Sequence, residues 1–191
     1  MTESVSTPRL RATFAIYLVL IVAAAFIGPR GVGSWAYYVT GAIGFLCVAL
    51  ACLGRIWCSV FIAGRKDATL VTTGPYAVCR HPLYSLSVLG ALGLGLTTRS
   101  PLLCAATVLA ILALVLVAAA REEKYLANAF PEAFAAYVAA TPSKWWPASA
   151  RPLPDRIDVH PAVYWKAFLD AGSFFLLWLL VAVSTEYRLS M

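Results

Sequence analysis

Residues 70–84 read Leu-Val-Thr-Thr-Gly-Pro-Tyr-Ala-Val-Cys-Arg-His-Pro-Leu-Tyr, a polar stretch in an otherwise very apolar sequence. Gly74 and Pro75 form a turn signal, because glycine tolerates unusual backbone angles while proline presets φ and removes a hydrogen-bond donor. Pro82 suits the first turn of a helix, and Tyr84 leads directly into an apolar run. Packing in an apolar core would not explain an arginine, a histidine and two tyrosines within nine residues. The stretch therefore predicts a binding site at the surface of a membrane-embedded region.

The overall composition predicts an integral membrane protein that forms one domain over residues 1–191. Hydrophobic residues make up 61% of the chain and charged residues 13%, whereas soluble domains are about half apolar and about a quarter charged. The net charge of +6 does not require a nucleic-acid partner, because basic residues also orient membrane proteins. The five cysteines contain no Cys-x-x-Cys pair, so we expect neither a disulfide framework nor a metal site.

The apolar runs predict an all-α, polytopic helical membrane protein with about five transmembrane helices. A helix needs ~20 apolar residues to cross a bilayer, and the third run is shorter, so we expect it to begin within the headgroup layer. Gly90 and Gly93 on this run are expected to let a neighbouring helix approach closely. The five expected spans cover residues 10–27, 35–53, 83–96, 102–120 and 168–183.

Two polar segments separate these spans, a connector over residues 54–82 and a segment over residues 121–166. The fourth helix is expected to continue past the membrane to about Asn128 and to break at Pro131. With the N-terminus inside, 12 of the 15 lysines and arginines fall on the same side as both polar segments. The three exceptions are Arg30, Arg99 and Arg188. This bias predicts that the N-terminus and the binding site face the cytoplasm.

The third and fourth spans form a hairpin, so their cytoplasmic ends must lie close together. This brings His81, which precedes the third span, near Glu122, which follows the fourth. A single histidine without a second nearby ligand is poor for a metal, and the mixture of groups suits a zwitterionic, partly aromatic cofactor better. Arg80 is expected to contact a lipid phosphate, while Glu123 is left open between a place in the pocket and pairing with Lys124 or facing water.

Three motifs carry a resemblance to a known family: Gly-Pro-Tyr at 74–76, Arg-His-Pro-x-Tyr at 80–84 and Glu-Glu-x-x-Leu-x-x-x-Phe at 122–130. Together they resemble the isoprenylcysteine carboxyl methyltransferases, integral membrane enzymes that use S-adenosylmethionine and are related to the phospholipid methyltransferases. The resemblance covers about residues 45–147. The candidate substrate-binding residues are Arg121 and Tyr137. It implies a cofactor site made of Ala68, Thr69, Leu70, Val71, Tyr76, His81, Pro82, Leu83, Tyr84 and Glu122.

The resemblance implies a methyl transfer from S-adenosylmethionine to a lipophilic small molecule, with membrane lipids as partners. Backbone groups of Leu70 and Val71 would read the adenine edge, while His81 would bind the methionine carboxylate. Glu122 would bind the ammonium group or the ribose. Methyl transfer depends mainly on positioning and on exclusion of water, so no residue is assigned as a catalytic acid or base.

Departures from the family pattern leave the methyl acceptor open among carboxylate, thiol, amine and hydroxyl groups. Ala118 stands where the carboxyl-methylating members carry a substrate-binding arginine, and the helix over residues 168–183 is an addition to the family plan. Two other functions stay open. One is an NADPH-dependent sterol or steroid reductase, which typically carries asparagine where Leu83 stands. The other is a non-catalytic membrane protein on the same scaffold, and the sequence does not indicate the oligomeric state.

Overall fold

The computed structural model describes residues 3–62, 69–145, 156–157, 159 and 161–190. These residues form helices and loops and contain no strand, which confirms the all-α fold. The helices are α1 (Glu3–Phe26), α2 (Trp35–Ile62), α3 (Pro75–Val78), α4 (Pro82–Thr97), α5 (Pro101–Ala129), α6 (Pro131–Ala140) and α7 (Pro161–Ser190).

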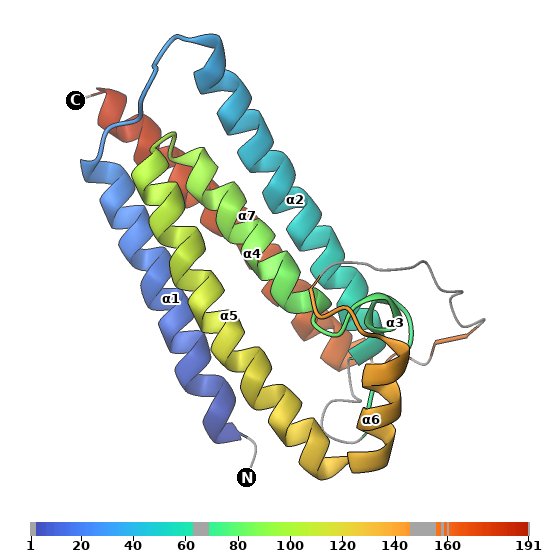
Figure 1. Cartoon of the computed structure of the whole chain (residues 1–191). Coiled ribbons are helices and arrows are strands. Elements are labelled where there is room, and N and C mark those ends of the chain that lie inside the picture. Colours follow the sequence, from blue (N-terminus) through green and yellow to red (C-terminus); the bar gives the residue numbers. More distant parts are fainter. Residues whose placement is uncertain (1–2, 63–68, 146–155, 158, 160, 191) are drawn as a thin grey trace.

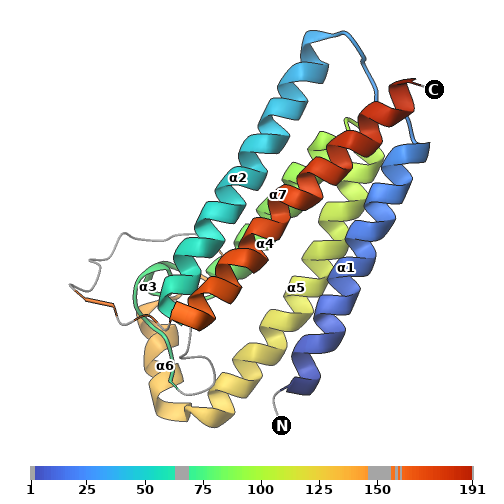
Figure 2. The same cartoon turned by 180° about the vertical axis from the view of Figure 1, so that it is seen from behind.

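The five long helices lie side by side in one bundle, and the short helices α3 and α6 lie together at one end of it (Figure 1). The N-terminus lies toward the end that carries α6, and the C-terminus lies at the opposite end, as the view from behind also shows (Figure 2). Helix α4 packs against α2, α5 and α7, while α1 covers α5 and α7. The two helices of the expected hairpin, α4 and α5, therefore deliver their polar ends to the same end of the bundle.

The structure confirms a polytopic helical membrane protein. Three helices in the described part of the chain are long and apolar enough to cross a membrane, namely α2, α5 and residues 164–187 of α7. Residues 11–26 of α1 and helix α4 are apolar but shorter, which agrees with the short third run expected from the sequence. The side of the membrane on which each end lies stays a prediction.

The observed helices extend beyond several expected spans. Helix α2 continues to Ile62 rather than ending at residue 53, and α7 begins at Pro161 and ends at Ser190 rather than covering 168–183. Apolar runs mark the part of a helix that lies in lipid, whereas the helix itself continues until a residue breaks it. Helix α5 ends at Ala129 just before Pro131, as expected.

Glycines on α4 allow close helix packing, which confirms the expectation for Gly90 and Gly93. A Cβ added at Gly93 would lie 2.6 Å from the carbonyl oxygen of Gly44 on α2, so these two helices meet backbone to backbone. A Cβ at Gly90 would overlap the ring of Phe174 on α7. Small residues thus place α4 in the interior of the bundle.

A polar clamp closes the end of the bundle opposite to α3 and α6. The Tyr37 hydroxyl on α2 donates a hydrogen bond to Glu186 Oε1 on α7 at 2.7 Å. Arg99, in the turn between α4 and α5, donates to the same oxygen at 3.2 Å, and its guanidinium lies over the Tyr37 ring. This clamp ties the turn between α4 and α5 to α2 and α7.

Candidate functional site

The turn at Gly74 anchors the polar motif to the end of α2. Gly74 has a φ of +61°, and a Cβ there would overlap the ring of Phe61, so only glycine fits. Helix α3 follows at once, and its Tyr76 packs with Phe61 and Cys58 of α2 in one buried cluster. The motif is therefore held against the bundle before the chain enters α4.

Arg80 is buried and joins three parts of the chain, so the expected contact with a lipid phosphate is wrong. Its Nη1 donates to the carbonyl oxygens of Thr141 at 2.8 Å and Pro142 at 2.9 Å, just after α6. Its Nε donates to Glu123 Oε1 on α5 at 3.2 Å. Its side chain is only 6% exposed, because the segment after α6 folds back over it. Arg80 stabilises the architecture of the site.

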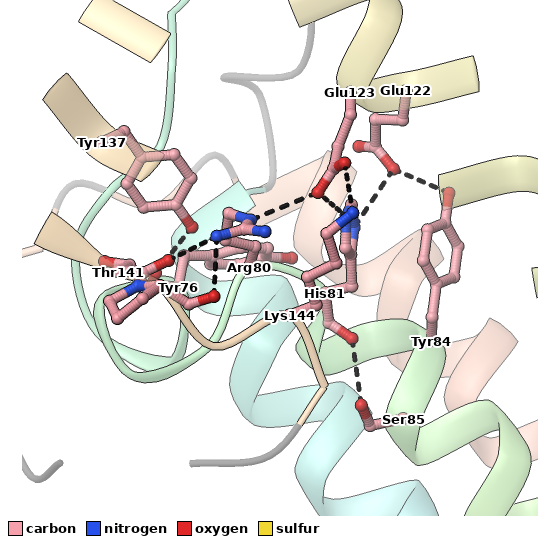
Figure 3. Close-up of polar contacts among 11 residues, drawn as sticks. Tyr76, Arg80, His81, Tyr84, Ser85, Glu122, Glu123, Tyr137, Thr141 and Lys144 are labelled. Atoms are coloured by element: carbon pink, nitrogen blue, oxygen red, sulfur yellow. Dashed lines mark hydrogen bonds and ion pairs between the residues drawn. The ribbon is translucent and has the colours of Figure 1, made fainter. Parts of the chain in front are cut away.

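Glu123 is the centre of this network, so of the two possibilities left open for it, facing water or pairing with Lys124 is wrong. Besides Arg80, it contacts His81 Nε2 at 3.1 Å and Lys144 Nζ at 2.8 Å (Figure 3). Lys144 reaches it because the backbone of residues 143–144 accepts hydrogen bonds from the amides of residues 80–81. The carboxylate is thus fully engaged by donors from two distant segments.

Glu122, one residue earlier on α5, points to a different set of partners. Its Oε2 accepts a 2.7 Å hydrogen bond from the Tyr84 hydroxyl and lies 4.0 Å from His81 Nδ1 (Figure 3). The imidazole of His81 stacks on the Tyr84 ring and also lies against Trp145, with ring centroids 5.4 Å apart in both cases. The structure thus brings His81, Tyr84 and Glu122 together, as the helical hairpin predicts.

Two tyrosines border the network on the side of α3 and α6. The Tyr137 hydroxyl donates to the carbonyl oxygen of Tyr76 at 2.7 Å and is buried. The Tyr76 hydroxyl is also buried but has no hydrogen-bond partner among the described residues. Burial raises the pKa of both phenols above the usual value of 10. Tyr137 therefore has a structural role here, while the Tyr76 hydroxyl remains a buried donor without a partner among the described residues.

The other predicted site residues lie at varying distances from this centre. Thr69 is exposed, and Leu70 and Val71 are half-buried, with Val71 packed on the cluster around Tyr76. Leu83 packs on the same cluster, and Pro82 is buried at the start of α4. Arg121 is exposed, and Ala68 lies outside the described residues. The roles of Arg80, Glu123 and Lys144 in this network were not predicted from the sequence.

The residues present fit a zwitterionic cofactor with a methionine-like end. Glu122 offers a half-exposed carboxylate to an ammonium group or a ribose, and His81, with Nε2–H donated to Glu123, would offer Nδ1 to a carboxylate in its doubly protonated form. The buried Tyr76 hydroxyl supplies a further donor without a partner among the described residues. No three His, Cys, Asp or Glu side chains come close enough to hold a metal ion within the described part of the chain.

Comparison with known proteins identifies the family. Residues 39–133 match the family model described as phospholipid methyltransferase, and this segment contains Tyr76, His81, Tyr84 and Glu122. This part of the chain belongs to the phospholipid methyltransferase family. The resemblance inferred from the three motifs is thereby confirmed at the level of the family, and the site described above lies within a membrane methyltransferase domain.

Two curated relatives also match this chain. The cobalt-zinc-cadmium resistance protein CzcN of Cupriavidus metallidurans is 42% identical over 129 residues, which are 67% of this chain and 59% of that protein. The nickel-cobalt-cadmium resistance protein NccN of Alcaligenes xylosoxydans xylosoxydans is 41% identical over 110 residues, 58% of this chain and 51% of that protein. The chain thus spans between half and two thirds of the length of these relatives. No solved structure matches it significantly.

Proposed function

We propose that this chain is an S-adenosylmethionine-dependent methyltransferase that acts on a lipophilic small molecule within the membrane. The observation that carries this proposal is the cluster of His81, Tyr84 and Glu122 inside the segment that matches the family. Bound S-adenosylmethionine would supply a methyl group on a sulfonium, from which the neutral thioether is a good leaving group. The protein then has to bind, orient and dehydrate the reacting groups.

The distribution of hydrogen bonds assigns different roles to the two adjacent glutamates. Glu123 is engaged by Arg80, His81 and Lys144, so its charge is balanced inside the protein. Glu122 has a neutral donor, Tyr84, as its hydrogen-bond partner and is more exposed, at 38% against 21% for Glu123. Glu122 therefore retains the capacity to bind the cofactor's ammonium group or ribose. His81, oriented by Glu123 on one side, presents its other nitrogen toward the same place.

The remaining predicted residues complete the cofactor site in this proposal. The Tyr76 hydroxyl would donate to the cofactor, and the backbone of Leu70 and Val71 would contact the adenine. Pro82 and Tyr84 would separate the cofactor from lipid. In this proposal the acceptor reaches the site from the apolar bundle, and the surplus of basic residues in the polar segments supports a site at the cytoplasmic face.

The names of the relatives suggest a physiological role for the reaction in metal resistance. CzcN and NccN are both named for resistance to cobalt and cadmium. We infer that the methyl transfer by this chain supports growth in the presence of such divalent metals, through a modified lipid or other lipophilic acceptor.

Titration of the purified protein in one detergent tests the proposed function. We expect binding of S-adenosylmethionine or S-adenosylhomocysteine in the micromolar range, which is typical of enzyme substrates. Binding of NADPH with no binding of either sulfur compound would instead support the alternative reductase. Absence of binding by all three would support a non-catalytic role on the same scaffold.

A further inference from the structure

A second polar cluster lies between the membrane helices α2, α4 and α7. Arg55 Nη2 on α2 contacts Asp170 Oδ2 on α7 at 2.8 Å, and Arg55 Nη1 donates to the Ser87 hydroxyl on α4 at 2.9 Å. The guanidinium also lies over the ring of Phe174, with 5.1 Å between Cζ and the ring centroid. The family motifs contain none of these four residues.

Arg55 has an incomplete set of partners. Its Nε is buried and has no hydrogen-bond partner among the described residues, while its side chain is 19% exposed. Asp170 is 55% exposed, so its carboxylate can leave the guanidinium and be solvated. Ionisable side chains within membrane helices are costly and usually have a function. The fold therefore holds an arginine that can offer Nε and Nη2 together to another anion.

The position of Arg55 along α2 matches the depth of an amphiphile headgroup. Arg55 follows Trp35 by twenty residues, which corresponds to ~30 Å of helix, about the thickness of the hydrocarbon core. Trp35 is exposed at the other end of α2, as expected of an aromatic residue at the membrane interface. Arg55 accordingly lies at the interface on the side of the methyltransferase site.

The second cluster is connected to the methyltransferase site through one face of α4. Ser87 follows Tyr84 by three residues, and side chains at this spacing are neighbours on a helix. Tyr84 packs on the buried cluster that contains Phe174 and Tyr17. Phe174, beneath the Arg55 guanidinium, and Tyr84, which is bonded to Glu122, therefore belong to one apolar cluster.

We propose that Arg55 is the acceptor-binding residue, and that it binds an anionic oxygen group, a carboxylate or phosphate, carried on an apolar chain. Asp170 occupies the guanidinium in the free protein and is displaced when the anion binds, while Ser87 holds the guanidinium in place. This inference rests on the methyltransferase function proposed above and names the class of its acceptor. A planar fork of donors suits carboxylate and phosphate oxygens.

The proposed acceptor site includes residues of a helix that lies outside the segment matching the family. Helix α7 supplies Asp170 and Phe174, and it lies beyond residue 133. Ala118 leaves α5 without the arginine that the carboxyl-methylating relatives carry there. Arg55 provides a cation on another helix, so the acceptor can be anionic without that arginine.

The test measures amphiphile binding to the intact protein by native mass spectrometry from maltoside micelles. The probes are dodecyl phosphate and dodecanoate, with dodecanol and dodecyltrimethylammonium as uncharged and cationic controls. The variants are Arg55→Gln, Arg55→Lys and Asp170→Asn. Arg99→Gln is the matched control, because it breaks an arginine–glutamate pair to the same helix α7 at the opposite end of the bundle.

We expect the wild-type protein to bind dodecyl phosphate or dodecanoate more tightly than dodecanol. Whichever of the two binds more tightly shows whether the acceptor group is a phosphate or a carboxylate. Arg55→Gln should weaken anion binding about tenfold or more. Arg55→Lys should weaken it less, since it keeps the charge and loses the fork. Asp170→Asn should tighten binding, because it removes the competing carboxylate, and Arg99→Gln should leave it unchanged. Equal binding by Arg55→Gln and wild type, or weaker binding by Asp170→Asn, would overturn the assignment.

Titration of the same samples with S-adenosylmethionine separates the two proposals. If the wild type binds S-adenosylmethionine but shows no preference for anions, the acceptor assignment alone is overturned. If anion binding depends on Arg55 but neither S-adenosylmethionine nor S-adenosylhomocysteine binds, the methyltransferase function and the acceptor role both fall. Arg55→Lys and Asp170→Asn keep the assignment testable if Arg55→Gln does not fold.

Discussion

Glu123 Oε1 lies 3.1 Å from His81 Nε2, so the second glutamate of the pair, and not the first, is hydrogen-bonded to the histidine. The same oxygen accepts from Arg80 Nε at 3.2 Å, and the other oxygen accepts from Lys144 at 2.8 Å. The first glutamate, Glu122, is left to Tyr84. This division separates a carboxylate that stabilises the fold from one that is available to a ligand.

Replacing Glu123 with glutamine should destabilise the protein. Arg80 is buried and would lose its anionic partner. Loss of one partner costs ~3–5 kcal/mol in a fully buried pair, and partial exposure of Glu123 reduces this to about 2 kcal/mol. The thermal midpoint should fall by roughly 4–8 °C. Glu122→Gln is the matched control, and a midpoint equal in both variants would contradict the structural role of Glu123.

Removal of Glu122 or His81 should weaken cofactor binding while the fold persists. Glu122→Ala and His81→Ala should each raise the dissociation constant of S-adenosylmethionine about ten- to a hundredfold, because each removes a hydrogen bond to a charged group. Calorimetry in one detergent measures this. Glu132→Gln on the exposed side of α6 is the control. Unchanged affinity in both alanine variants would mean that the cofactor binds elsewhere.

Tyr76→Phe and Tyr137→Phe should have opposite effects. The Tyr137 hydroxyl bonds the Tyr76 carbonyl, so its loss should cost about 1 kcal/mol of stability and leave cofactor affinity nearly unchanged. The Tyr76 hydroxyl has no partner among the described residues, so its loss should not lower stability but should weaken S-adenosylmethionine binding. Thermal unfolding and calorimetry on both variants test this. A stability loss confined to Tyr76→Phe would reverse the two roles.

Alkaline pH should destabilise the protein through the same two phenols. Their folded pKa values are raised by burial, so above pH 10 the unfolded chain ionises them while the folded protein still holds the protons. This contribution to stability is complete below pH 10 and is lost as the pH rises toward the folded values. Each phenol adds a slope of about 1.4 kcal/mol per pH unit. Unfolding free energy measured between pH 9 and 11 should fall less steeply in Tyr137→Phe.

Labelling from outside the cell tests the orientation. Thr72 and Lys144 lie at the end of the bundle that carries α3 and α6, and Val32 lies in the loop between α1 and α2 at the other end. Cysteines introduced at Thr72 and Lys144 should react with an impermeant maleimide only after the membrane is opened. A cysteine at Val32 should react in intact cells. The reverse pattern would invert the topology.

The polar motif could be located from sequence because its chemistry is local. Gly74 needs its positive φ, and Pro82 marks the start of α4 within a few residues. The proximity of His81 and Glu122 also followed from one short hairpin. In both cases the decisive contacts depend on neighbours in the chain or on a single connection.

The network around Glu123 could not be predicted because its partners are distant in sequence. Arg80 lies 43 residues before Glu123, and Lys144 lies 21 residues after it. Both reach the carboxylate because the chain after α6 folds back onto residues 80–81. The pair of Arg55 and Asp170, 115 residues apart, likewise depends on the packing of α7 on α2. Neither hydrophobic periodicity nor a local sequence motif predicts such contacts.

The two polar contacts between α2 and α7 also bound the uncharged stretch that these two helices share. Tyr37 meets Glu186 near one membrane surface, and Arg55 meets Asp170 near the other. These contacts are 18 residues apart on α2 and 16 apart on α7, with no charged residue between them on either helix. The corresponding helix lengths are roughly 27 Å and 24 Å. The stretch between these two contacts is thus slightly shorter than a typical core of ~30 Å, which the distance from Trp35 to Arg55 matches.

Helix tilt cannot relieve this mismatch, because tilting shortens the uncharged stretch further along the membrane normal. A span shorter than the core is accommodated by thinning of the bilayer or by snorkelling of its flanking side chains, and the Arg55 side chain is long enough to snorkel. Either adjustment brings the Arg55 guanidinium and the lipid headgroups to the same level.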